Sequence, residues 1–330
     1  MKNKISLGKI FFFVVIVAAI FYGFKHFGET ADVVKALIHG DWRWVSLALI
    51  IQISYFPFYA KYLKVCFDYF QLGYSQKRLM QVFLATKFTN IVFPLATVGQ
   101  VALFTAEAKR EGDSGTSATF AAGLAMIVDV ISFWIVSLVP ILILEKNHIL
   151  KPYYLYAFLI LSFAVVILTV FILLYFKNKK FAKVAFGFFS RNMNKFGTSL
   201  EKEEVPIMAG KLRHYLPKLL GYSIFLQIMN ISTLFLLYLA FGQTLYLSNV
   251  VTSYTIGMLF TIVSITPQGA GFAEAAMVLA MVASGMPLSN AILITAAFRG
   301  LQIALPFFVG FVYFQKLKLL SDNKKVISKT

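Results

Sequence analysis

Apolar runs long enough to cross a lipid bilayer recur along this chain and restrict the folds open to it. In hydrocarbon every backbone N–H and C=O must find its partner inside the protein, so an apolar run of about twenty residues indicates a spanning α-helix. The sequence lacks the period-two alternation of a transmembrane β-barrel. It therefore predicts an all-α, polytopic integral membrane protein with one helical domain over residues 1–330. The six expected spans are Ile10–Phe24, Trp44–Tyr62, Ser117–Leu144, Tyr153–Tyr175, Leu219–Phe241 and Leu288–Phe314.

Charge is distributed unevenly between the linkers. The chain is 59% apolar and only 14% charged, yet its formal net charge is +17. The basic segments are the N-terminus, the Lys61–Arg78 region, Lys109-Arg110, the 177–218 loop and the tail from Gln315. Basic linkers lie on the cytoplasmic side of a membrane. Six crossings therefore predict a multi-pass protein of a bacterial or archaeal cell membrane with both termini in the cytoplasm. The charge is then explained by topology and by attraction to an anionic membrane surface, and no nucleic-acid partner is needed. The aromatic-rich 177–195 stretch predicts an interfacial helix.

Two apolar segments are interrupted and do not fit as simple spans. Residues 79–108 are broken around Pro94 and Gly99, and residues 250–283 are broken between Ile265 and Glu274. Each half is too short to cross about 30 Å of hydrocarbon at about 1.5 Å per residue. We therefore predict two re-entrant hairpins that enter the membrane from opposite faces.

The two hairpins resemble each other in sequence. Each ends at a Ser-Gly pair, and an ionisable residue follows at the same distance: Asp129 lies 14 residues after Gly115, and Arg299 lies 14 residues after Gly285. Inverted repeats with broken helices are a recurring transporter architecture, with the site near the middle of the membrane. The pattern predicts an inverted repeat.

The breaks also have a chemical consequence. Proline removes an N–H and glycine lets the backbone leave the helix, so the N–H groups that begin the second half-helix are free to bind an anion such as phosphate. The alternative interpretation is that each break is a kink required only for packing.

The residues at the breaks resemble a known family. Phe93-Pro94 with Gly99-Gln100, and Thr266-Pro267-Gln268-Gly269-Ala270-Gly271-Phe272-Ala273-Glu274, are similar to the membrane region of lysylphosphatidylglycerol synthases. Stand-alone relatives are called flippase-like proteins, and the resemblance covers about residues 8–318. It implies that the chain moves a phospholipid or a lipid-linked headgroup between leaflets. Synthase activity is not implied, because no stretch is long enough for the soluble aminoacyl-transferase domain.

The chain departs from the family pattern at three places. Gln268 replaces a usual Gly, Gln100 replaces a usual Glu, and Ala125–Val128 are apolar where the family tends to have an acidic-Arg pair. The last two changes remove charge from the first half, so a mechanism that needs ions there does not transfer directly.

Ionisable groups within spans are costly and are therefore functional candidates. Glu274 could contact a cationic headgroup, carry a proton or cap its half-helix. Arg299 could hold a lipid phosphate or pair with Asp129 or Glu274, and Lys87 could reach the interface or guide a phosphate. We expect interhelical hydrogen bonds or substrate contacts from Gln52, Gln227, Asn230 and Gln302. The candidate substrate-binding residues are Pro94, Gly99, Gln100, Asp129, Pro267, Gly269, Gly271, Glu274, Arg299 and Lys87.

Cofactor chemistry is not expected from this sequence. His26, His39, His148 and His214 have no metal-ligand spacing, Cys66 is the only cysteine, and no Walker loop is present. The leading expectation is a lipid translocase. The alternatives are an integral-membrane transferase acting on a lipid phosphate, and a non-catalytic partner of a lipid-modifying enzyme or glycosyltransferase.

Overall fold

The computed structural model describes residues 40–92, 96–146, 152–177, 209–243, 246–263 and 267–327, and all regular structure in these ranges is helical. The predicted span Ile10–Phe24 and most of the basic 177–218 loop lie outside the described residues. The helices are α3 (Trp42–Tyr69), α4 (Gln76–Val92), α5 (Ala96–Glu111), α6 (Gly115–Lys146), α7 (Pro152–Lys177), α9 (Ala209–Ala240), α10 (Leu247–Val263), the short 3-10 helix η1 (Pro267–Gly269), α11 (Phe272–Ala283) and α12 (Leu288–Ile327).

Three described helices are long and apolar enough to cross a membrane, over Gly115–Leu142, His214–Ala240 and Leu288–Leu317. The predicted spans in α3 and α7 are also continuous helices. The helical membrane class is therefore confirmed, whereas the number of crossings and their orientation stay predictions.

The outer surface of the bundle is apolar, as a protein in lipid requires. On α7, Phe163 is 69% exposed and Tyr156 is 63% exposed. Further large apolar side chains on the same helix point outward, namely Leu155, Leu159, Ile160, Val166, Ile167 and Val170. A contiguous apolar surface of this kind is rare on soluble monomers.

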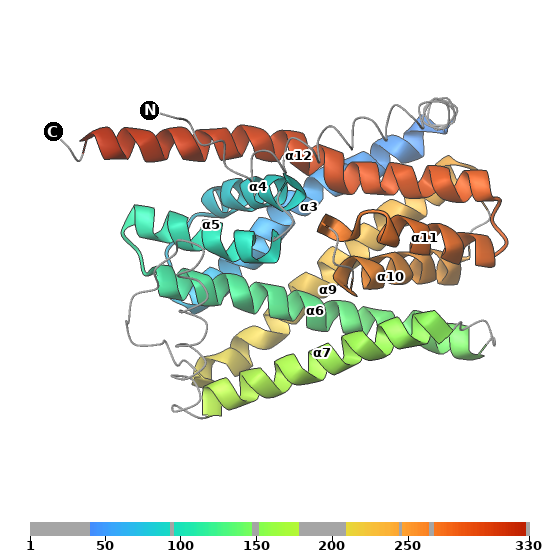
Figure 1. Ribbon diagram of the computed structural model, residues 1–330, viewed down its shortest axis with the longest axis horizontal. Helices are drawn as coiled ribbons and strands as arrows, with labels where there is room; N and C mark the ends of the chain where they lie inside the picture. The colour runs from blue at the N-terminus through green and yellow to red at the C-terminus, as the bar shows by residue number, and fades with distance from the viewer. Residues whose placement is uncertain are drawn as a thin grey trace, which may run out of the picture.

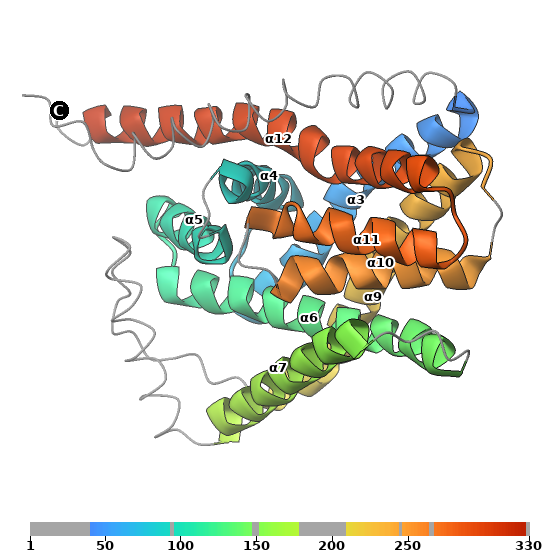
Figure 2. The same cartoon turned by 45° about the vertical axis from the view of Figure 1, so that its right-hand side comes forward.

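Both predicted hairpins are present as pairs of short helices. Helices α4 and α5 form the first pair, and α10 and α11 form the second, with η1 within the second break. In both views the two pairs lie side by side between the long helices α6 and α12 (Figure 1 and Figure 2). The hairpins therefore occupy the interior of the bundle, where a broken backbone can be covered by protein.

The two halves exchange packing partners. Helix α5 packs on α6, the long helix that follows it, and α11 packs on α12 in the same way. Across the halves, α4 packs on α12, whereas α10 packs on α6. The first helix of each hairpin thus packs against the long helix that follows the other hairpin. The inverted orientation of the repeat stays a prediction.

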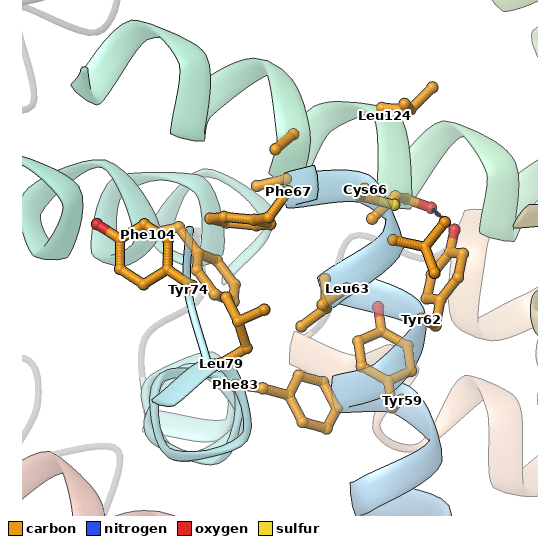
Figure 3. Close-up of a cluster of buried hydrophobic side chains, with 14 of the residues drawn as sticks. Tyr59, Tyr62, Leu63, Cys66, Phe67, Tyr74, Leu79, Phe83, Phe104 and Leu124 are labelled. Carbon is orange, nitrogen blue, oxygen red and sulfur yellow. Dashed lines mark hydrogen bonds between the residues drawn. The ribbon is translucent and has the colours of Figure 1, made fainter. Parts of the chain in front are cut away.

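Aromatic packing joins the first hairpin to α3. The ring of Tyr59 stacks on that of Phe83 with centroids 4.1 Å apart, and Phe67 lies 5.3 Å from Phe104. These side chains belong to one buried cluster that extends over α3, α4, α5, α6 and α9 (Figure 3). Offset or tilted ring pairs at such distances add to the stabilisation from area burial.

A charge cluster closes the open end of the first hairpin. Glu107 near the end of α5 pairs with Arg78 at the start of α4 and with Arg110, which lies 2.7 Å away. Glu111 accepts a second contact from Arg110 at 2.8 Å. Since the Arg78–Glu107 pair joins the start of α4 to the end of α5, the two helices are held together there.

The contact between α4 and α12 is unusually close. A Cβ added at Gly310 would clash with the carbonyl oxygen of Leu84 and would lie 3.0 Å from Cβ of Phe88. The Phe88 ring packs against Phe307 and Phe311 on either side of this glycine along α12. Small residues allow such close helix approach in membranes.

We predict that Gly310→Ala lowers the thermal unfolding midpoint of the detergent-solubilised protein, because overpacking costs about 1–3 kcal/mol. The matched control is Gly300→Ala on the same helix, where an added Cβ meets no atom within 4 Å. Both changes gain the same helix propensity. Equal midpoints for the two variants would contradict the close contact.

Candidate functional site

The second break is a tight turn made by residues of positive φ. Gln268 has φ 56°, Gly269 has φ 71° and Gly271 has φ 85°. A Cβ at Gly269 would lie 2.6 Å from Cα of Thr261, so this position requires glycine for space as well as for conformation. Helix α11 then begins at Phe272. The turn thus brings the end of α10 against the start of α11.

Arg299 on α12 donates hydrogen bonds to acceptors at this turn. Nε of Arg299 donates to Oε1 of Glu274 at 2.5 Å, and its Nη2 donates to the backbone carbonyl of Gln268 at 2.6 Å. The other carboxylate oxygen of Glu274 accepts from the Gly271 N–H at 2.7 Å. Glu274 therefore caps α11 and pairs with Arg299 at the same time. Among the partners left open by the sequence, Glu274 is the one Arg299 contacts.

Arg299 keeps donor capacity for a ligand. It is only 7% exposed, and of the five N–H donors of a guanidinium, two are used in these hydrogen bonds. A small pocket with room for about one water lies beside it. Its lining residues are Tyr254, Gly257, Met258, Thr261, Ala273, Met277, Phe298, Arg299 and Gln302. A buried guanidinium with unused donors suits a phosphate oxygen.

A second ionisable centre lies on α6. Asp129 accepts hydrogen bonds from the hydroxyl of Tyr59 at 2.8 Å and from that of Ser223 at 2.7 Å. One turn away, the Tyr62 hydroxyl donates to the Ala125 carbonyl (Figure 3). Three helices, α3, α6 and α9, therefore meet at one carboxylate inside the bundle.

Lys87 lies between the two centres. It is within electrostatic range of both Asp129 and Arg299, and its ammonium lies 5.3 Å from the centroid of the Phe83 ring. Its helix, α4, also contacts η1. The first hairpin therefore reaches the second break.

The predicted residues fall into three groups. The first group comes together at the second break and consists of Pro267, Gly269, Gly271, Glu274 and Arg299. The second group is Lys87 on α4 and Asp129 on α6, which interact electrostatically with each other. The third group belongs to the first break. Pro94 lies outside the described residues. Gly99 and Gln100 are in α5, but the Gln100 side chain is not in the described part of the structure.

In the described helices, two interhelical hydrogen bonds involve the predicted residues. Gln227 accepts from the Tyr254 hydroxyl, and Gln302 contacts Asn230 at 3.5 Å. Gln52 is buried, and its Oε1 has no partner within the described ranges. No group of three or more His, Cys, Asp or Glu suited to a metal occurs in the described part of the chain.

Sequence reasoning missed the hydroxyl partners of Asp129. Tyr55, Tyr59 and Tyr62 recur at helical spacing on α3, which is one face of that helix. This stripe of phenols along a span was the available signal. Ser223 carried no comparable signal, since it lies 94 residues from Asp129 in the sequence.

Comparison with known proteins gives one positive finding. The family model described as Lysylphosphatidylglycerol synthase TM region matches residues 7–310, which is most of the chain. No curated protein matches.

We predict that Gly269→Ala destabilises the protein more than Gly271→Ala. Both substitutions place a side chain at positive φ, which costs about 1–2 kcal/mol, but only the Cβ at position 269 meets neighbouring backbone. The comparison of thermal midpoints in detergent tests this. A larger loss for Gly271→Ala would contradict the geometry of the turn.

We also predict an energetic coupling between Arg299 and Glu274. A double-mutant cycle of Arg299→Gln and Glu274→Gln should give about 1–3 kcal/mol, because the side chains are only 8% and 30% exposed. The reference cycle is Lys64→Gln with Asp68→Asn, an ion pair at 2.9 Å whose side chains are 38% and 40% exposed. That cycle should give less than about 1 kcal/mol. Equal couplings would show that burial does not strengthen the Arg299 pair.

Proposed function

This chain belongs to the lysylphosphatidylglycerol synthase transmembrane-region family, and from that premise we propose that it translocates a phospholipid or lipid-linked substrate with an anionic headgroup between membrane leaflets. The site of translocation is the second break, and the lipid phosphate is the group recognised there.

The observation that carries the proposal is the buried Arg299 beside a pocket. A guanidinium in a membrane interior is costly, and such residues usually mark a substrate pathway. Glu274 and the Gln268 carbonyl hold the guanidinium of Arg299 in one orientation. Its other three N–H donors form no hydrogen bond with the residues that the structure describes. Donors left over on a buried guanidinium are what binding of a phosphate oxygen requires.

The arrangement of the hairpins supports movement between leaflets. Each hairpin packs on both long helices, α6 and α12, and the first hairpin contacts η1. In transporters built from broken-helix repeats, one repeat rocks against the other around a site at their interface. Here that interface includes the contact between α4 and η1, the turn to which Arg299 of α12 donates a hydrogen bond.

The pocket is too small for a headgroup as it stands. With room for about one water, it corresponds to a closed state. Separation of α12 from the α10–α11 pair, which together line the pocket, would enlarge it and would expose Arg299. Lys87 would move with α12, because α4 packs on that helix. The acyl chains would stay in the bilayer beside the apolar outer surface.

The test is lipid exchange in proteoliposomes. Wild type and Arg299→Lys are reconstituted with fluorescently labelled phosphatidylglycerol, phosphatidylethanolamine, an aminoacylated phosphatidylglycerol or a polyprenyl phosphate, and an impermeant quencher reports the leaflet. We expect protein-dependent exchange of an anionic lipid, reduced tenfold or more in Arg299→Lys, because lysine lacks the planar donor pair. A tenfold loss corresponds to about 1.4 kcal/mol.

Arg43→Lys is the matched control, since this arginine is exposed at the start of α3. Its exchange rate should equal that of the wild type. Absence of exchange for every lipid, with a folded protein, would overturn the proposal and favour a non-catalytic membrane partner. Full activity of Arg299→Lys would remove Arg299 from the site.

A further inference from the structure

The ionisable side chains around the breaks balance one another. In the described part of the chain, Lys87 and Arg299 contribute two positive charges at this site, and Asp129 and Glu274 contribute two negative charges. In their ordinary ionised forms the set is neutral. Uncompensated charge inside a membrane protein is strongly unfavourable, so a neutral set is the stable resting arrangement.

An anionic headgroup disturbs this balance. If a lipid with one negative charge binds at Arg299, the site carries one excess negative charge. Two groups could remove it by taking up a proton, Asp129 or Glu274, and their hydrogen-bond partners distinguish them.

Glu274 has only hydrogen-bond donors as partners among the described residues. Its partners are the Arg299 guanidinium and the Gly271 N–H, and both of these groups can only donate. A protonated Glu274 would place a donor against a donor.

Asp129 has partners that can exchange roles. The hydroxyls of Tyr59 and Ser223 donate to the carboxylate, but a hydroxyl can also accept. A proton on Asp129 can therefore be received by rotation of one hydroxyl, without loss of a hydrogen bond. Asp129 is also only partly buried within the bundle.

A series of side-chain contacts, which includes two stacked aromatic rings, links Asp129 to the pocket. The ring of Tyr59 stacks on that of Tyr55 with centroids 5.7 Å apart, and Tyr55 interacts with the Asn230 amide. Asn230 contacts Gln302, which lines the pocket beside Arg299. The titratable groups facing Asp129 are Tyr55, Tyr59, Tyr62 and Cys66 from α3, Lys87 from α4 and Tyr254 from α10. The titratable groups of α5 named above, Glu107, Arg110 and Glu111, lie in the charge cluster at the C-terminal end of that helix.

We propose that Asp129 is a proton-binding site that carries one proton with each singly charged anionic lipid, which makes the protein an electroneutral proton–lipid symporter. The proton comes from water on the side where the lipid enters and returns to water on the other side, and no covalent bond changes. This inference rests on the proposed translocation at Arg299 and names the ion that accompanies it.

The experiment imposes a pH gradient on proteoliposomes that contain labelled phosphatidylglycerol. At equilibrium, one-to-one symport gives a tenfold excess of the lipid in the leaflet facing the alkaline side for each pH unit, because one pH unit is one factor of ten in proton concentration. A potassium–valinomycin potential at equal pH should leave the distribution unchanged. Pyranine trapped inside should report one proton entering per lipid.

The variant is Asp129→Asn, which keeps the shape of the side chain. Its amide oxygen can accept from one of the two hydroxyls, and its NH2 can donate to the other, which then acts as acceptor. The variant should lose the response to the pH gradient while its unfolding midpoint stays near that of the wild type. Asp68→Asn, an exposed aspartate paired with Lys64, is the matched control and should respond as the wild type does.

The outcomes separate this inference from the proposed function. Exchange by the wild type that ignores the pH gradient, or follows the membrane potential, overturns the symport and leaves translocation intact. An Asp129→Asn protein that still concentrates lipid on the alkaline side also overturns it. If Asp129→Asn does not fold, the number of protons that the wild type moves per lipid tests the symport by itself, and a ratio of zero overturns it. No exchange by the wild type with any lipid overturns the proposed function and this inference with it.

Discussion

The backbone of a broken helix inside a membrane must be satisfied by protein, and in this molecule the guanidinium of Arg299 does so. It binds the carbonyl of Gln268 within the turn and the carboxylate of Glu274, which in turn accepts from the Gly271 N–H. These three hydrogen bonds tie the turn and the start of α11 to α12. Because they use only two of the five N–H donors of the guanidinium, the same residue that stabilises the break can also bind a ligand.

Both halves of the bundle use the interior for charge, but in different ways. The second half pairs a carboxylate with a fixed cation, whereas the first half surrounds a carboxylate with hydroxyls from α3 and α9. A fixed pair holds one electrostatic state. A carboxyl group among hydroxyls can adopt two electrostatic states, ionised and protonated. Lys87 interacts electrostatically with Asp129, so its own energy depends on which state is present. The proposed division between recognition and coupling follows from this difference.

Local signals predicted the helices and the breaks well. Apolar runs predicted α6 and α7 to within a few residues and the positions of α3, α9 and α12. However, α3 continues to Tyr69, α9 begins at Ala209, inside the predicted 177–218 loop, and α12 continues to Ile327. The Pro and Gly residues predicted both breaks. The partner of Arg299 could not be chosen from sequence, because Asp129 and Glu274 were equally available until the turn at Gln268 was in place. Ser223 and Asp129 come together only through the packing of α6 on α9, which leaves no periodic trace in the sequence.

The close contact at Gly310 has a kinetic consequence. With the Leu84 carbonyl and Phe88 pressed against α12, and the charge cluster holding α4 to α5, the first hairpin cannot shift without carrying α12 with it. Since α12 also bears Arg299, a movement of the first hairpin is coupled to the opening of the pocket beside Arg299. A molecule bound between α4 and α12 at Gly310, outside the residues that line the pocket, would therefore stop turnover at any lipid concentration and act as a non-competitive inhibitor.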